Sequence, residues 1–128
     1  MKLITNDLIN RFAQVGCQDR EIDPICVARF FNAFGKGTWY ATEYDPVTET
    51  CFGYVQLFEN EWGYFSIQEL GEAKHPQLGI PVIERDRYYT ESRISQLCPE
   101  LQESIKRRSE LREMEMGEER PDDFELER

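Results

Sequence analysis

Apolar residues recur at helical spacing near the start of the chain, which predicts a first helix over residues 5–16. The apolar side of this helix holds Leu8, Ile9, Phe12, Ala13 and Val15. Thr5 or Asn6 can accept hydrogen bonds from the free N–H groups of the first turn. Gly16 is a natural end, because glycine tolerates the left-handed conformation that closes many helices. The polar residues 17–24 that follow are predicted to form a loop.

The middle of the chain is rich in β-branched and aromatic residues, which predicts strands. The predicted strands cover residues 25–34, 38–44, 50–58 and 64–67. Short turns join them, with the sequences "GKG", "DPVTE" and "ENEWG". Asp45 and Pro46 suit the first two positions of a turn, because the aspartate side chain can bond the backbone and proline fixes φ. Strands joined by such short turns pair most readily as antiparallel neighbours.

A short helix and an edge strand are predicted next. Ser66 and Glu69 have the spacing of a capping box, and Gly71 is a natural stop for the helix that they begin. After a loop rich in proline and glycine, residues 82–89 have strand character. Pro81 before them and the charged residues within them favour a position at the edge of the sheet.

The last part of the chain changes character. Residues 92–116 have a helical composition, and Pro99 suits a first helical turn. The predicted fold class is therefore α+β, with a small antiparallel sheet of four to five strands, an N-terminal helix, a short helix after the fourth strand and a C-terminal helix. We expect one α+β domain over residues 1–97, a helical extension over 98–116, and an acidic disordered tail over 117–128.

The formal net charge of −10 is distributed unevenly. Residues 1–93 carry 9 Lys/Arg and 14 Asp/Glu, residues 94–128 carry 6 and 11, and each part therefore has a net charge of −5. A negative protein repels phosphate, so the charge disfavours nucleic-acid binding and docking on anionic membranes. Binding of a basic protein partner, or solubility alone, would explain the negative charge.

Patterns that are absent from the sequence predict the cellular location of the protein and the state of its cysteines. No apolar run approaches the ~20 residues that a membrane helix needs, and the first residues lack the apolar region of a secretory signal. We therefore expect a cytoplasmic protein. The four cysteines lack the close spacing of zinc ligands, and three of them stand beside apolar residues, which predicts buried thiols rather than a metal site or disulfides.

The stretch "WYATEYDP", residues 39–46, places carboxylates between large aromatic residues. Strict alternation along a strand puts one set of side chains on one face: Trp39, Ala41 and Glu43. The opposite face then receives a second set: Tyr40, Thr42 and Tyr44. Asp45 is explained as a turn former, whereas Glu43 is either a solvated or ion-paired strand residue or part of a binding surface.

The register of the hairpin decides between these roles for Glu43. If Tyr40 lies opposite Val55, Glu43 joins an aromatic and partly polar face that suits a binding surface. A slip by one residue places Glu43 beside apolar side chains, where Arg29 or Arg85 would have to neutralise it. The sequence leaves both registers open.

The segment "ERDR" forms a second charged cluster, in which Glu84 and Asp86 share one face of the predicted strand and Arg85 and Arg87 the other. Together with Glu43, these acids could hold a divalent cation or form an acid–base pair. Alternatively, these residues protect an edge strand by their charge and have no binding or catalytic role.

Motifs of known catalytic and cofactor sites are missing from the sequence. His75, the single histidine, lies in a loop with no nucleophile motif nearby, and no glycine-rich phosphate loop occurs. We therefore predict no catalytic residue, no cofactor and no metal ligand.

Three motifs together resemble a bacterial family catalogued as domain of unknown function 2958: "WYATEYDP", "FGYVQLFENEWGYFSIQEL" and "LGIPVIERDRYY". The resemblance covers about residues 1–97. It implies a protein often encoded on plasmids and other mobile elements, with no assigned enzymatic activity. The candidate binding or family-motif residues that it implies are Trp39, Tyr40, Thr42, Glu43, Asp45, Tyr64, Phe65, Glu84, Arg85 and Asp86. Gly63, Ser66 and Glu69 also belong to these motifs, but a turn and a helix cap explain them.

Three functions compete on this basis. The leading hypothesis is a non-catalytic protein-interaction module that binds a basic host protein, with carboxylates standing in for phosphates. The alternative is a small carboxylate-based, metal-dependent hydrolase, which requires the acids to converge in one pocket. A third hypothesis, nucleic-acid binding through local arginine and lysine residues, is opposed by the overall charge. The oligomeric state stays open.

Overall fold

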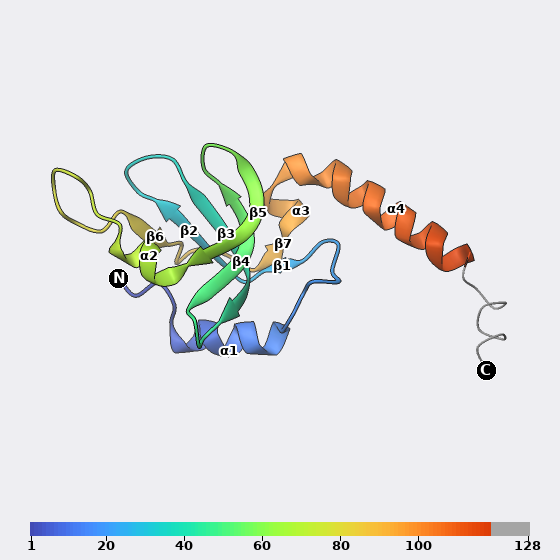
Figure 1. The fold of residues 1–128 in the computed structure, drawn as a ribbon, viewed down its shortest axis with the longest axis horizontal. Helices are drawn as coiled ribbons and strands as arrows, with labels where there is room; N and C mark the ends of the chain where they lie inside the picture. Colours follow the sequence, from blue (N-terminus) through green and yellow to red (C-terminus); the bar gives the residue numbers. More distant parts are fainter. Residues whose placement is uncertain (119–128) are drawn as a thin grey trace.

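The protein folds around a five-stranded antiparallel sheet (Figure 1). The computed structural model describes residues 1–118. The strands of the sheet are β2 (Ala28–Asn32), β3 (Thr38–Asp45), β4 (Thr50–Gln56), β5 (Asn60–Ser66) and β6 (Ile83–Arg85). They lie side by side in the order β5-β4-β3-β2-β6. Two shorter strands, β1 (Ile25–Cys26) and β7 (Ser92–Arg93), pair with each other outside this sheet.

Helical segments pack on both sides of the sheet. One side receives α1 (Asn6–Val15) and α2 (Ile67–Glu72). The other side receives α3 (Ile94–Leu97), the 3₁₀ helix η1 (Pro99–Leu101) and the start of α4 (Gln102–Glu118). The rest of α4 extends away from the sheet (Figure 1). The predicted α+β fold is confirmed, and within residues 1–118 no helix combines the length and the apolar content needed to cross a membrane.

Helix α1 begins and ends where the sequence predicts. Thr5 Oγ1 accepts a hydrogen bond of 3.2 Å from the N–H of Leu8, and Gly16 adopts a φ of 73° at the end of the helix. The ring of Phe12 is buried and lies 5.6 Å from the ring of Tyr44 in β3. The apolar stripe of α1 therefore closes the core on this side of the sheet.

The opposite side has a core of its own. Tyr40 of β3 and Tyr54 of β4 are buried there beneath Ile94, Cys98 and Ile105 from the C-terminal segment. Because the start of α4 supplies Ile105, the helical segment after β7 is anchored to the sheet before it extends away. The predicted acidic tail begins at residue 117, and residues 119–128 lie outside the described part of the chain.

The hairpin of β4 and β5 differs from the prediction. The segment "ENEWG" was expected to be a turn, but Asn60 starts β5 and Gly63 lies within that strand, opposite Gly53. The prediction of a turn at Gly63 is therefore wrong. Two aromatic pairs face each other across the strands: Phe52–Tyr64 and Tyr54–Trp62. Such cross-strand pairs stabilise a hairpin, which explains why the strand runs through the glycine.

The outer elements are shorter than predicted. The strand expected over 25–34 is divided, because β1 pairs with β7 while β2 starts at Ala28. The strand expected over 82–89 is an edge strand, as predicted, but only three of its residues pair with β2. The helix expected over 92–116 begins instead with β7 and is interrupted before Pro99, whose missing N–H cannot continue the helix.

The four cysteines are free thiols. Cys26, Cys51 and Cys98 are fully buried, as their apolar neighbours in the sequence suggest, whereas Cys17 is exposed. Burial raises the pKa of Cys26 to about 12 and that of Cys98 to about 11, so both remain protonated at neutral pH. These thiols act as small core residues.

Glu100 in η1 fastens the C-terminal segment to the sheet. One of its oxygens, Oε2, accepts hydrogen bonds from Gln56 Nε2 at 2.7 Å, Tyr54 Oη at 3.1 Å and Asn60 Nδ2 at 3.3 Å. Burial alone would raise the pKa of Glu100, but hydrogen bonds from its own backbone N–H, Gln56 and Tyr54 outweigh burial and lower that pKa.

The lowered pKa of Glu100 predicts a contribution to acid sensitivity. A carboxyl group whose folded-state pKa lies below its unfolded value stabilises the protein above the unfolded value, and this stability is lost as the pH falls through the folded pKa. We expect Glu100→Gln to show a smaller fall in Tm between about pH 7 and pH 3 than the wild type. The control is Glu103→Gln, whose exposed carboxylate lies 3.8 Å from Arg107. Identical pH profiles for Glu100→Gln and the wild type would contradict the prediction.

Candidate functional site

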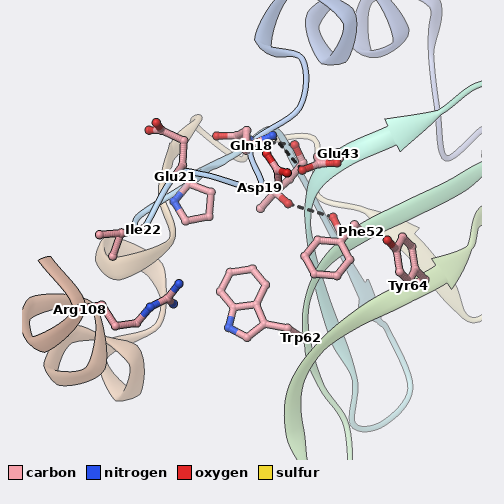
Figure 2. Close-up of a pocket in the computed structure, with 11 residues that line it drawn as sticks. Gln18, Asp19, Glu21, Ile22, Glu43, Phe52, Trp62, Tyr64 and Arg108 are labelled. Carbon is pink, nitrogen blue, oxygen red and sulfur yellow. Dashed lines mark hydrogen bonds between the residues drawn. The ribbon is translucent and has the colours of Figure 1, made fainter. Parts of the chain in front are cut away.

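A pocket of about 350 Å³ opens where the loop between α1 and β1 meets one face of the sheet and α4 (Figure 2). Its walls therefore come from three parts of the chain that are distant in sequence. The lining residues are Gln18, Asp19, Glu21, Ile22, Pro24, Thr42, Glu43, Phe52, Trp62, Tyr64 and Arg108.

A β-bulge in β3 determines which side chains reach this pocket. Tyr40 lies opposite Tyr54 and Ala41 opposite Gly53, but the next pair is Glu43 with Phe52, so Thr42 is an extra residue in β3. An extra residue reverses the alternation of faces beyond it. Each of the two predicted registers therefore holds for only part of the hairpin: the slipped register is found up to Ala41, and the register that would pair Tyr40 with Val55 is found from Glu43 onward. Glu43 consequently shares its face with Tyr40 rather than with Trp39.

The loop between α1 and β1 fixes Glu43. Glu43 Oε2 accepts a hydrogen bond of 2.9 Å from the backbone N–H of Gln18. The buried Gln18 side chain donates through Nε2 to the carbonyls of Ile25 and Thr42, each at 2.8 Å, and accepts at 2.7 Å from the N–H of Ile25. Gln18 thus joins the loop, the bulge and β1. The pairing of Glu43 with Arg29 or Arg85, which the slipped register would have required, is not found among residues 1–118.

Aromatic rings from β4 and β5 form the floor of the pocket. The rings of Phe52 and Trp62 are nearly parallel, with an interplanar angle of 13° and centroids 6.0 Å apart. Tyr64 meets Phe52 edge to face at 5.0 Å and is 79% exposed. Phe52 and Trp62 are half-buried, so part of each ring faces solvent. This floor ends beside the carboxylate of Glu43 (Figure 2).

A second pocket of about 280 Å³ continues from the first toward the turn between β3 and β4. The two pockets share Glu43, Phe52 and Tyr64. The residues that only the second pocket contributes are Tyr44, Asp45, Thr48 and Thr50. We call the two adjoining pockets the groove. Its length suits an extended segment rather than a compact small molecule.

The charge of the groove is predominantly negative. Its acidic lining residues are Asp19, Glu21, Glu43 and Asp45, and its basic lining residue is Arg108. Glu21 also forms an exposed ion pair with Arg93, at 3.3 Å. The other acids have no ion pair among residues 1–118. The groove therefore favours cationic ligands.

Four of the residues implied by the family motifs line the groove: Thr42, Glu43, Asp45 and Tyr64. Asp45 also forms the predicted turn, because its Oδ1 accepts a hydrogen bond of 2.9 Å from the N–H of Val47. The other motif residues of β3 and β5 are buried in the cores: Trp39, Tyr40 and Phe65. Their positions explain them as packing residues.

The remaining motif residues lie at the other edge of the sheet, in and after β6. Asp86 pairs with Arg29, with Oδ2 2.8 Å from Nη1. Arg85 donates to the backbone carbonyls of Lys2 and Leu3. Glu84 lies in β6, opposite Phe31 of β2. The motif acids are thus separated, with Glu43 and Asp45 on the central strand β3 and Glu84 and Asp86 in and after the edge strand β6. Among the described residues no group of three or more His, Cys, Asp or Glu side chains could hold a metal ion.

Gln18, Phe52 and Trp62 are groove residues that the sequence did not assign to a site. Phe52 belongs to the aromatic face that one of the two open registers placed around Glu43, whereas Gln18 was placed in a polar loop without a role. Gln18 carries no local signal, because its partners are Thr42 and Glu43, 24 and 25 positions further along the chain. Trp62 was assigned to a turn. The segments "FGY" and "WGY" each place a glycine between two aromatic residues, and this similarity could have indicated two paired strands.

Comparison with known proteins gives one match. A family model described as "Protein of unknown function (DUF2958)" matches residues 3–105. The match includes β1 to β7 and reaches Ile105 in α4, further than the expected limit at residue 97. No curated protein and no solved structure matches the chain.

Proposed function

The chain belongs to the DUF2958 family, whose description assigns no activity, and we propose from the groove that this protein is an interaction module for basic protein segments. The observation that carries the proposal is the combination of Glu43 with the half-exposed rings of Phe52 and Trp62 in one open groove. Lysine and arginine side chains have apolar stems and cationic ends, and both parts find a matching surface there.

The shape of the groove supports an extended occupant. It runs from the side of α4 past Tyr64 to the turn at Asp45, so several consecutive side chains can contact it. Binding of this kind needs complementary charge and aromatic contacts and no reactive group. We place the partner in the cytoplasm, and the mobile-element setting implied by the family motifs makes a basic host protein the partner class that we propose.

A labelled basic peptide tests this function. The probe is a fluorescein-labelled peptide of about twelve residues in which Lys and Arg alternate with Gly and Ser. Fluorescence polarisation should give a Kd that rises several-fold between about 50 and 300 mM NaCl, since the contacts are partly exposed. In ¹H–¹⁵N spectra, the peptide should shift resonances of β3, β4, β5 and the loop at residues 17–24. Shifts scattered over the whole acidic surface would contradict a defined site.

Two variants and one control locate the binding. Glu43→Gln removes the charge but keeps an acceptor for the N–H of Gln18, and we expect the peptide to bind about tenfold more weakly. Tyr64→Ala, which removes a ring that is 79% exposed, should weaken binding about threefold without unfolding the protein. The control, Glu113→Gln on the exposed part of α4, removes the same charge outside the groove. If it weakens binding as much as Glu43→Gln, the groove is not the site.

A further inference from the structure

We infer that the pocket between the loop at residues 17–24 and α4 is a subsite for one arginine side chain of the partner, and this inference rests on the proposed function. The pocket has the larger volume of the two parts of the groove, at about 350 Å³ against 280 Å³. Its floor is aromatic and its rim carries carboxylates from Asp19, Glu21 and Glu43. A long side chain with a planar cation matches both features.

The floor favours a flat cation. The rings of Phe52 and Trp62 are nearly parallel, with 13° between their planes, so their faces have the same orientation toward a flat group. The guanidinium group of arginine is planar and weakly hydrated, so it can lie flat on such rings and lose little solvation. The lysine ammonium is compact and strongly hydrated, and it gains less from the same surface.

The carboxylate of Glu43 is positioned to bond a stacked guanidinium. Its Oε2 is held by the N–H of Gln18, and its Oε1 accepts no hydrogen bond from any residue between 1 and 118. A guanidinium group donates in its own plane, so it can rest on the rings and bond the free oxygen at their edge at the same time. An ammonium has no face to stack while it makes that bond.

Arg108 of α4 lines the same pocket but does not stack on its aromatic floor. Its guanidinium points toward the indole of Trp62 across the pocket (Figure 2), and none of the ion pairs among the described residues includes it. Both cation–π contacts among residues 1–118 belong to Arg29, so no guanidinium of the described chain lies on the rings of Phe52 and Trp62. The arginine of the partner would lie deeper in the pocket, next to Glu43.

Three peptides that differ at one position test the subsite. Each has about ten residues, Gly and Ser with two flanking Lys, and Arg, Lys or citrulline at the centre. Citrulline keeps the shape of arginine without its charge. We expect the Arg peptide to bind at least about fivefold more tightly than the Lys peptide and about tenfold more tightly than the citrulline peptide.

The response of the two tryptophans locates the arginine. The indole N–H resonance of Trp62 should shift on binding of the Arg peptide, while that of Trp39, which is 6% exposed in the opposite core, should not. In Trp62→Leu and in Glu43→Gln, the preference for Arg over Lys should fall below about twofold, because each change removes one half of the subsite. If Trp62→Leu fails to fold, the isosteric variant Glu43→Gln still tests the loss of this preference.

Two different results would overturn the inference. If the Arg and Lys peptides bind equally and both shift the groove resonances, the groove reads only positive charge, and the arginine subsite is wrong while the proposed function stands. If none of the three peptides binds and the longer basic peptide also fails, the proposed function is wrong and the subsite falls with it.

Discussion

Gly53→Ala is expected to destabilise the protein by roughly 3 kcal/mol, because a Cβ at this position would lie 1.8 Å from the carbonyl oxygen of Tyr40. That oxygen belongs to the backbone of β3, which cannot move without breaking the ladder with β4. The bulge at Thr42 lies next to this contact, so only glycine allows the two strands to approach. Chemical denaturation followed by circular dichroism measures the loss of stability.

Gly63→Ala is the matched control. Gly63 lies directly opposite Gly53 in the next strand, and a Cβ there would meet no atom within 4 Å. We expect a change within about 0.5 kcal/mol, since the substitution is made in open space and alanine is no worse than glycine in a strand. Equal stability of the two variants would show that β3 and β4 do not approach at Gly53 as closely as described.

Gln18→Ala is expected to lower the stability by roughly 3 kcal/mol, equivalent to a fall in Tm of about 12 °C. The truncation removes all three side-chain hydrogen bonds and leaves the N–H and carbonyl of Ile25 and the carbonyl of Thr42 without these partners. It also releases the loop whose backbone N–H holds Glu43, so binding of the basic peptide should weaken in parallel. Thermal denaturation and fluorescence polarisation measure the two effects.

Gln14→Ala controls for the loss of a glutamine side chain. Gln14 lies on the exposed side of α1, where its one side-chain hydrogen bond is a 3.3 Å contact from Arg11. Its replacement should change the stability by less than about 0.5 kcal/mol. A similar loss in both variants would contradict the role of the three hydrogen bonds of Gln18, because Gln14 makes none of them.

Features that depend on a few adjacent residues followed from the sequence. The cap at Thr5, the stop at Gly16 and the turn at Asp45 lie where the local pattern placed them, and so does the cap at Ser66, whose Oγ accepts from the N–H of Glu69 at 3.1 Å. Each of these is decided by one side chain and the backbone two to four positions away. The antiparallel pairing of β2, β3, β4 and β5 as consecutive neighbours also followed, because short turns permit little else, whereas the position of β6 beside β2 did not follow.

The candidate site followed only in part. Glu43, Thr42, Asp45 and Tyr64 belonged to motifs that the sequence showed, but it did not show that Trp39 is a core residue while Trp62 lines the groove. The bulge, which has no sequence signature of its own, separates Trp39 from Glu43 because it reverses the faces of β3 beyond Ala41. Trp62 was missed because its segment was expected to be a turn rather than part of β5.

The sequence by itself determined the α+β class, the main hairpins, the buried character of three cysteines and the acidic charge, since these depend on composition and on contacts between near neighbours. Only the tertiary structure decided which residues the acidic side chains contact. Glu43 meets the loop at Gln18, 25 positions away, and Asp86 meets Arg29, 57 positions away. Contacts at such separations depend on the register and packing of the whole sheet, and no local pattern encodes them.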